Sequence, residues 1–367
     1  MSVPTPPPPL YSPPARPPSA VDAFGPAWAN MTRVLFRPFR LRKWFKLGFI
    51  ALLAGVAQGG GGGGGGGAPP GGGGTGGTGG GGGGAGAGPA FDQLAAWYHA
   101  HQAAVISGAV ALGAFLLVFV LVMLYVSSVF RFIFLESVIT GEARIREPWH
   151  RNKAQGLSFM GWRLGFGFLA LLAFGVFVGL PIGLMVVSLV RQTGGTPSAQ
   201  TILGSIGLVL LAVFLSVIVL FIIGLISALT RDFVLPLMYL RRSGVIGAWR
   251  EFWPILTQNK VGFLVYFLLK ILAAVASWIA GMLLALCGLL IAACPLGLLG
   301  LLGYGLVAGL GIHAWHWSYL WAIIPTAFVV IIALGYWITC VILPIPVFFQ
   351  SYALKYLGLV EPTAATI

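Results

Sequence analysis

The stretch TILGSIGLVLLAVFLSVIVLFIIGLISALT, residues Thr201–Thr230, contains no charged side chain and consists almost entirely of aliphatic, aromatic and glycine residues. About 18 to 20 such residues cross the roughly 30 Å hydrocarbon core of a bilayer as a helix. Two further uncharged runs, Val105–Val129 and Leu164–Val190, have the same character, and apolar sequence continues through much of Val261–Phe349. None of these runs alternates with the period of two that strands of a membrane barrel require. The sequence therefore predicts membrane-spanning helices.

The composition of the whole chain agrees with this prediction. Hydrophobic residues make up 58% of the 367 residues and charged residues only 8%, with a mean hydropathy of +0.95. A soluble domain carries about 25% charged residues, so the charged residues here are too few to cover a water-facing surface. We predict an all-α integral membrane helical bundle of about six transmembrane helices, arranged as three hairpins with interfacial amphipathic helices.

The net charge of +13 is concentrated in three clusters, Arg33–Lys46, Arg131–Arg163 and Arg231–Lys260. The positive-inside rule places all three in the cytoplasm, which predicts a multi-pass cell-membrane protein with both termini cytoplasmic. The expected partners are the lipid bilayer and its anionic headgroups at the cytoplasmic face; a protein partner or a second copy stays open. Nucleic acid is not an expected partner, because its binding requires a basic folded domain and these clusters all border apolar spans.

The chain divides into five predicted regions. Residues 1–25 form a disordered, proline-rich cytoplasmic tail, 26–57 an interfacial helix and a short first span, 58–90 a glycine-rich extracytoplasmic linker, 91–357 the membrane helical domain and 358–367 a C-terminal tail.

The predictions for the first span and for the linker depend on each other. The uncharged part of the span, Leu47–Ala57, covers only about 16 Å as a helix. We nevertheless expect it to cross, because otherwise the first basic cluster would lie on the same side as the linker. The linker contains G-x-G-x-x-G, but it lacks the preceding strand and the following helix that a phosphate-binding loop needs. We interpret it as a flexible spacer.

A threefold repeat is visible in the basic clusters. The sequences KLGF, RLGF and KVGF, at Lys46–Phe49, Arg163–Phe166 and Lys260–Phe263, each begin a span. We expect three aromatic, apolar segments that follow the returning spans to lie along the inner membrane face: Val129–Val138, Arg231–Leu240 and Pro344–Leu357. The glycine-rich segment Cys294–Gly311 is left over, and it is either a re-entrant element or a seventh span.

Two intramembrane features are candidate sites. Gly175, Gly179 and Gly183 share one helical face, which favours close helix packing, although a kink at Pro181 is also typical of helices that line transport sites. Lys270 is an intramembrane charge and therefore a functional candidate. Because no acidic residue lies inside any predicted span, we favour the alternative that Lys270 snorkels to the border.

Metal binding and catalysis have little support in the sequence. The pairs His99 and His101, and His313 and His316, lie at predicted outer borders, where they are weak candidates for Zn or Cu ligands; isolated interfacial histidines are the alternative. The three cysteines show no metal or disulfide spacing. Catalysis needs clustered acids or a nucleophile beside a base, and the sequence shows neither. We therefore expect no enzyme activity, no catalytic residue and no cofactor.

Two segments carry a resemblance to known proteins. VFRFIFLESVITGEARIREPWHRNKAQGLSFMGWRLGFGFL (Val129–Leu169) and RDFVLPLMYLRRSGVIGAWREFWPILTQNKVGFLVYFLL (Arg231–Leu269) are similar to a family of uncharacterised prokaryotic polytopic membrane proteins. More distantly, they resemble the membrane domain of some glycerophosphodiester phosphodiesterases. The resemblance implies a multi-helix membrane domain without an assigned reaction, since the phosphodiesterase barrel and its metal-binding acids are absent.

These observations predict a non-enzymatic integral membrane protein with an accessory or envelope-related role. The alternative is a transporter or lipid-handling protein with a cavity between its helical hairpins, in which Lys270 and Pro181 would lie near the path.

Overall fold

The computed structural model describes residues 19–55, 89–190, 199–309 and 320–361, and the regular elements within these ranges are all helical. The prediction of an all-α fold is therefore confirmed. The elements are α1 (Phe24–Phe36), α2 (Leu41–Ala54), α3 (Pro89–Thr140), α4 (Arg146–Arg151), α5 (Lys153–Phe174), η1 (Gly175–Gly179), α6 (Leu180–Val190), α7 (Ala199–Leu229), η2 (Thr230–Val234), α8 (Leu235–Arg241), α9 (Val245–Gln258), α10 (Lys260–Gly309), α11 (Leu320–Ile342) and α12 (Pro344–Val360), where η1 and η2 are single π-helical turns.

Five helical segments within the described ranges are long and apolar enough to cross a membrane, compared with the predicted six. The helix expected to be the first span, α2, has 14 residues and is therefore only about 21 Å long. It packs against α3 and α11 and buries Leu47, Ile50 and Ala51. The five segments are Ala100–Thr140, Lys153–Val187, Leu203–Arg241, Lys260–Gly303 and Ile324–Ile342.

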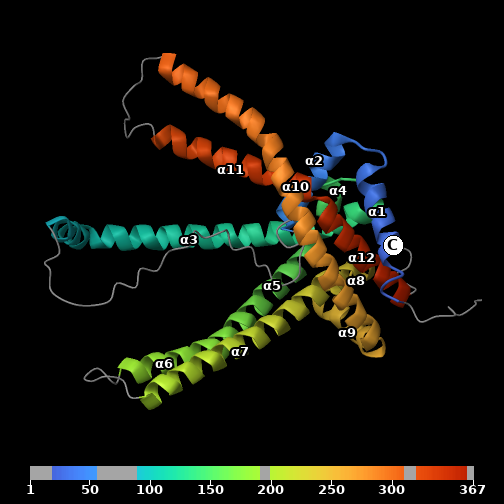
Figure 1. The fold of residues 1–367 in the computed structure, drawn as a ribbon, viewed down its shortest axis with the longest axis horizontal. Coiled ribbons are helices and arrows are strands. Elements are labelled where there is room, and N and C mark those ends of the chain that lie inside the picture. Colours follow the sequence, from blue (N-terminus) through green and yellow to red (C-terminus); the bar gives the residue numbers. More distant parts are fainter. Residues whose placement is uncertain (1–18, 56–88, 191–198, 310–319, 362–367) are drawn as a thin grey trace, which may run out of the picture.

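The long helices form three arms that radiate from one centre (Figure 1). The first arm is the N-terminal part of α3, the second is α5, η1 and α6 beside α7, and the third is α10 beside α11. Each arm belongs to one of three consecutive units of the chain, which begin with the short helices α1, α4 and α9. These helices carry Trp28, Trp149 and Trp249, respectively. The threefold pattern of the sequence is therefore present in the fold, although α2 is too short to pair with the outer part of α3.

The centre of the molecule is a buried core, which we call the hub. It consists of residues 129–140 of α3, together with η2, α8 and α12, and is surrounded by α1, α2, α9 and the start of α10. Aromatic rings fill its middle: Tyr266 stacks on both Tyr352 and Tyr356, with 4.9 Å between ring centres in each pair.

The hub corrects the prediction that the segments after the returning spans lie along the membrane surface. Phe132, Ile133, Phe134 and Leu135 are consecutive and all are at most 1% exposed. A helix lying in the interface keeps one polar face in water, whereas a helix that is apolar all round is buried. These segments therefore pack on one another, and the amphipathic helices at the periphery are α1 and α9, each of which buries one face.

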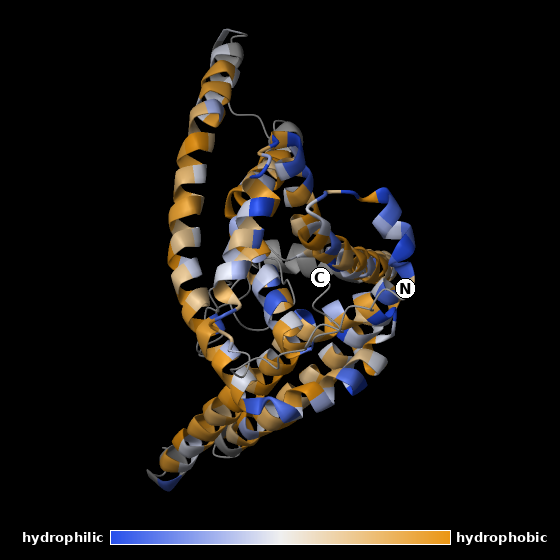
Figure 2. Ribbon diagram, turned by 90° about the vertical axis from the view of Figure 1, so that its right-hand side faces the viewer, coloured by the Kyte–Doolittle hydropathy of each residue, from blue (hydrophilic) through white to orange (hydrophobic). Residues whose placement is uncertain are grey.

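Hydrophobic residues cover the arms, and hydrophilic residues gather around the hub (Figure 2). Large apolar side chains on the second arm, such as Phe168, Leu171 and Phe221, are about 70% exposed. Water would not favour so many exposed apolar side chains, whereas lipid chains solvate them. The arms are the parts of the chain that contact the bilayer interior.

The segment Cys294–Gly311 is neither a re-entrant element nor a separate span within the described residues. Its part up to Gly309 continues α10, which is one helix of 50 residues and hence about 75 Å long. Pro295 lies inside this helix, as membrane helices tolerate when neighbouring groups satisfy the freed carbonyl.

The ends of the folded chain differ from two of the predicted region boundaries. Ala20 and Ala23 are buried in the hub, so the folded chain begins before the predicted boundary after residue 25. At the other end α12 continues to Val360, beyond the predicted end at residue 357. The first 18 residues and most of the glycine-rich linker, 58–90, lie outside the described residues.

An arginine-lined cavity as the candidate functional site

Three arginines mark the inner ends of the first two arms. Arg131 follows the uncharged run of α3, Arg163 precedes that of α5, and Arg231 follows that of α7 in the turn η2. All three line one cavity of about 320 Å³. The full lining is Leu124, Arg131, Phe159, Trp162, Arg163, Phe166, Gly167, Ala170, Ile223, Ser227, Ala228, Thr230 and Arg231.

Arg131 is held by the end of α2. The last carbonyls of a helix lack donors within the helix, and the carbonyl of Ala54 accepts hydrogen bonds from Arg131 Nε at 3.1 Å and Ser127 Oγ at 3.4 Å. Gly55 ends α2 in the left-handed region at φ 66°, as is common after a helix C-terminus. The guanidinium carbon of Arg131 also lies 5.8 Å from the ring centre of Phe159, within cation–π range. The short helix α2 thus positions a charge at the cavity.

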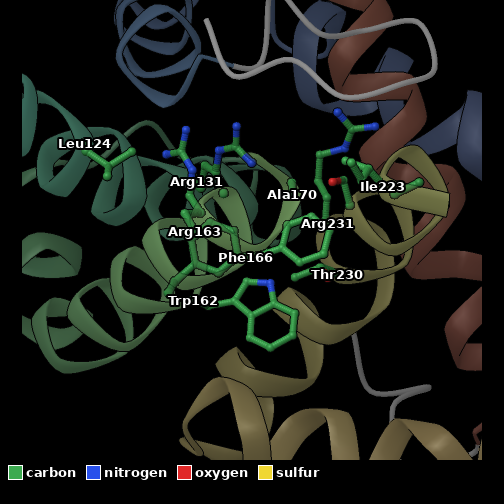
Figure 3. Close-up of a pocket in the computed structure, with 13 residues that line it drawn as sticks. Leu124, Arg131, Trp162, Arg163, Phe166, Ala170, Ile223, Thr230 and Arg231 are labelled. Carbon is green, nitrogen blue, oxygen red and sulfur yellow. The ribbon is translucent and has the colours of Figure 1, made fainter. Parts of the chain in front are cut away.

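The other two arginines approach from different elements. Arg163 Nη1 donates to Ser127 Oγ at 3.3 Å, and Arg231 Nε lies 3.6 Å from Asp232 Oδ1. The three arginine side chains extend to the same side of the cavity, and the ring of Trp162 lies on the opposite side (Figure 3). Three cations from three elements therefore face one space.

The charge of the cavity is strongly positive. Of the described residues that line it, three are arginines and none is acidic. Asp232 lies behind the lining, but its Oδ2 forms an ion pair with Lys270 Nζ and accepts a hydrogen bond from Tyr266 Oη at 3.3 Å. The single carboxylate of Asp232 is shared between Lys270 and Arg231. It therefore does not neutralise the positive charge of the lining, which an anion entering the cavity would reduce.

This ion pair contradicts the preference for a snorkelling Lys270. The residue is 7% exposed and lies in the hub, ten positions after the start of α10. Asp232, at 6% exposed, follows the uncharged run Thr201–Thr230 and so lies outside that predicted span, but the turn η2 carries it into the hub. The lysine is buried and paired, as buried charges must be.

The cavity is also amphipathic along its length. Leu124, Ala170 and Ile223 lie about two helical turns further into the arms than the arginines of their own chain segments, on α3, α5 and α7 respectively. Two turns correspond to roughly 11 Å along the helices. The cationic part therefore lies at the border of the hub, and the lining becomes aliphatic toward the membrane interior.

The predicted glycine packing face is not at a helix contact within the described chain; packing of this face between copies stays a prediction. A Cβ atom added at Gly175, Gly179 or Gly183 would meet nothing within 4 Å. Instead Val178 and Pro181 are buried, on helical turns that pack against α7. The π-helical turn η1, just before Pro181, shifts the helical register, which removes the glycines from the contact face.

The predicted histidine pairs are only partly described. His101 is exposed; its Nδ1 lies 2.9 Å from the carbonyl oxygen of Trp97, and the two rings stack at 5.0 Å. His99 lies on the same helix, α3, while His313 and His316 lie outside the described residues. Within the described part of the chain, no group of three or more potential metal ligands is assembled.

The arginine cavity was missed in the sequence because its arginines are separated by up to 100 positions. A usable signal was present: each arginine is the first charge at the inner end of a long uncharged run. Which of these end charges meet depends on the packing of α3, α5 and η2, and this is not visible in the sequence.

Comparison with known families agrees with the architecture. The profile of a family of unknown function, DUF7544, matches residues 18–367. The chain belongs to DUF7544. For this DUF7544 protein, no curated protein and no solved structure gives a match. The expected membership of a family without an assigned function is confirmed, and nothing supports the similarity to the membrane domain of glycerophosphodiester phosphodiesterases. The DUF7544 match includes all three arginines of the cavity.

Proposed function

We propose that this multi-pass membrane protein is non-catalytic and binds an acidic membrane lipid, with the lipid headgroup between Arg131, Arg163 and Arg231. The observation that carries the proposal is the convergence of three guanidinium groups on one cavity at the inner border of the spans. Like charges held together in a poorly solvated site repel one another, and an anion that enters the site relieves this repulsion. Arginine is also suited to phosphate recognition, since its planar fork binds two oxygens at once.

The apolar end of the cavity supports a lipid as the ligand. A headgroup at the arginines would have its attached chain beside Leu124, Ala170 and Ile223, toward the bilayer interior. A soluble anion would make no use of this lining. This proposal develops the lipid-handling alternative and extends the expected contact with anionic headgroups from the protein surface to a defined cavity.

Transport of a polar solute has less support. A transport site normally lies near the bilayer midplane. The cavity of about 220 Å³ between α10 and α11 is lined by Ile291, Ala292, Pro295, Leu296, Val330, Ala333, Leu334 and Trp337. Trp337 Nε1, the polar side-chain atom of this lining, already donates to the carbonyl of Gly288 at 2.9 Å.

The proposal is tested by lipid binding to the purified full chain in neutral detergent. Native mass spectrometry and thermal unfolding are recorded with phosphatidylglycerol and with phosphatidylcholine. We expect phosphatidylglycerol to be retained and to stabilise the protein, by about 2.7 kcal/mol at a hundredfold excess over its Kd. Arg163→Gln and the double variant Arg131→Gln/Arg163→Gln are expected to lose most of this effect.

Arg250→Gln is the matched control, because Arg250 is exposed on α9, away from the cavity lining. It should bind the lipid as the natural protein does. Without lipid, Arg163→Gln should unfold at no lower temperature than the natural protein, since neutralising one of three neighbouring cations relieves repulsion. Unchanged phosphatidylglycerol binding in folded Arg131→Gln/Arg163→Gln would refute the proposal.

A further inference from the structure

The lining of the arginine cavity discriminates between classes of acidic headgroup, and an inference about this selectivity rests on the proposed function. Besides the arginines, the polar side chains of the described lining are Ser227, Thr230 and Trp162. The Thr230 hydroxyl already donates to the carbonyl of Ile226 at 2.7 Å. The cavity therefore offers charge, but few neutral partners for the hydroxyl groups of a glycerol or sugar headgroup.

The lining also disfavours headgroups that contain an amine. An ammonium group in a buried site needs a carboxylate or a similar partner, and the described lining contains no acidic residue. Asp232 lies next to the lining, but its carboxylate already contacts both Lys270 and Arg231. Zwitterionic headgroups would place their positive charge among three arginines, where it is repelled.

A terminal phosphate fits the cations best. A phosphate monoester has three free oxygens and a charge between −1.5 and −2 at neutral pH, whereas the phosphate of a diester headgroup has two free oxygens and one charge. Guanidinium groups from α3, α5 and η2 line the same cavity. A terminal phosphate has a free oxygen for each of them, because no further substituent occupies its exposed side. We propose that the cavity selects lipids that end in a phosphate monoester over lipids with a diester headgroup.

The experiment compares phosphatidic acid, as the monoester, with phosphatidylglycerol of the same acyl chains, using the full-length protein in neutral detergent. At about pH 7.5 phosphatidic acid should bind at least about tenfold more tightly, which one additional hydrogen bond between charged groups can supply. At about pH 5, below the second phosphate pKa of about 6, this preference should fall severalfold. Inorganic phosphate is the third ligand and should bind much more weakly than phosphatidic acid, because it lacks the acyl chains.

The pH series needs an internal control, because groups of the protein also face or lie behind the cavity. A change in any protein group would alter the binding of both lipids, whereas protonation of the monoester alters only phosphatidic acid. Phosphatidylglycerol binding should therefore change little between the two pH values. The charged and titratable protein groups concerned are Arg131 from α3, Arg163 from α5, Arg231 and Asp232 from η2, and Tyr266 and Lys270 from α10.

Each outcome decides a different point. Equal, arginine-dependent binding of the two lipids would refute the selectivity for monoesters and leave the proposed function standing. Binding of neither lipid, or binding unchanged in Arg131→Gln/Arg163→Gln, would refute both proposals. Inorganic phosphate that binds as tightly as phosphatidic acid would show a site for soluble phosphate and would refute the lipid as the ligand.

Discussion

Single glycines determine how closely α2 and α10 approach their neighbours α11 and α12. A Cβ atom at Gly48 would lie 2.4 Å from Cys340 Sγ, and one at Gly262 would lie 2.7 Å from Tyr356 Oη. Such separations are too short for any real contact, so glycine is required at these two positions for steric reasons. Gly165, the corresponding residue of the second unit, has nothing within 4 Å. The repeated glycine of KLGF and KVGF therefore has a structural cause that RLGF lacks.

This difference predicts the effect of alanine at two matched positions. Gly262→Ala should destabilise the protein by about 1–3 kcal/mol, as overpacking of a core does, while Gly165→Ala should be neutral or slightly stabilising in thermal unfolding.

Burial raises the pKa of Tyr356 to about 12, so the clash in Gly262→Ala involves a neutral hydroxyl. This buried hydroxyl has no hydrogen-bond partner. Tyr356→Phe should therefore restore most of the stability of Gly262→Ala. Equal effects of the two alanine substitutions would contradict the packing seen at Gly262.

The buried pair of Lys270 and Asp232 predicts a second effect at the scale of residues. Lys270→Met should cost about 3–5 kcal/mol of folding stability, because it removes the buried cation of the Asp232 carboxylate and leaves only the less buried Arg231 beside it. The double variant Lys270→Met/Asp232→Asn should be more stable than Lys270→Met alone. Arg144→Met is the control: its ion pairs with Glu142 and Glu147 are exposed, and such pairs contribute at most about 1 kcal/mol. A simple sum of the two single effects in the double variant would show that the pair is not coupled.

At the scale of elements, the helices around the hub depend on one buried face each. Helix α1 packs against α12 through Ala27, Met31 and Val34, and Asn30 Nδ2 donates to Ser351 Oγ at 3.0 Å. This contact joins the first described helix to the last one. The ends of the described chain therefore lie on the same side of the molecule, at the hub.

Overpacking of α1 should loosen it from the hub. Ala27 is fully buried, whereas Ala29 on the same helix is exposed. Ala27→Leu should speed limited tryptic cleavage after Arg33, because the enlarged side chain forces α1 away from α12. Ala29→Leu should cleave at the rate of the natural protein. If both variants are cleaved alike, α1 is not docked through this face.

At the scale of the whole molecule, the hub and the outer ends of the arms lie at opposite ends of the segments that cross the membrane. The end of α2, at Ala54, lies beside Ser127 at the hub. Val105, further out on α3, is about 33 Å from Ser127 along the helix, and Pro89 begins the short segment of α3 that precedes a kink at His101. The chain between Ala54 and Pro89 thus passes from the hub side to the opposite side; the path of residues 56–88 lies outside the described residues.

The positive-inside rule then predicts that this linker is extracytoplasmic. In a chain whose three cysteines are replaced by alanine, Thr75→Cys should react with a membrane-impermeant maleimide in intact cells. Glu147→Cys, on the exposed surface of α4 at the hub, should react only after lysis. The reverse pattern would show that the hub lies outside and would overturn the predicted orientation.

Much of the fold was predictable because its causes are local in the sequence. Apolar runs such as Thr201–Thr230 exceed the length that a bilayer requires, so helix type and approximate position follow from a window of about 20 residues. The segments around Phe132 and Phe233 were harder to interpret, since an apolar segment beside a basic cluster is compatible with a membrane surface or with a protein core. Only their mutual packing identifies them as core.

The candidate site follows partly from the sequence and partly from how the chain packs. The sequence shows where charges stop and apolar runs begin, because a charge within hydrocarbon is costly, and this predicts that Arg131, Arg163 and Arg231 lie at one membrane border. That these three meet in one cavity, and that Asp232 pairs with Lys270, is visible only in the folded chain. Such contacts depend on how α3, α5, η2 and α10 pack in the hub, and packing between distant segments leaves no periodic signal in the chain.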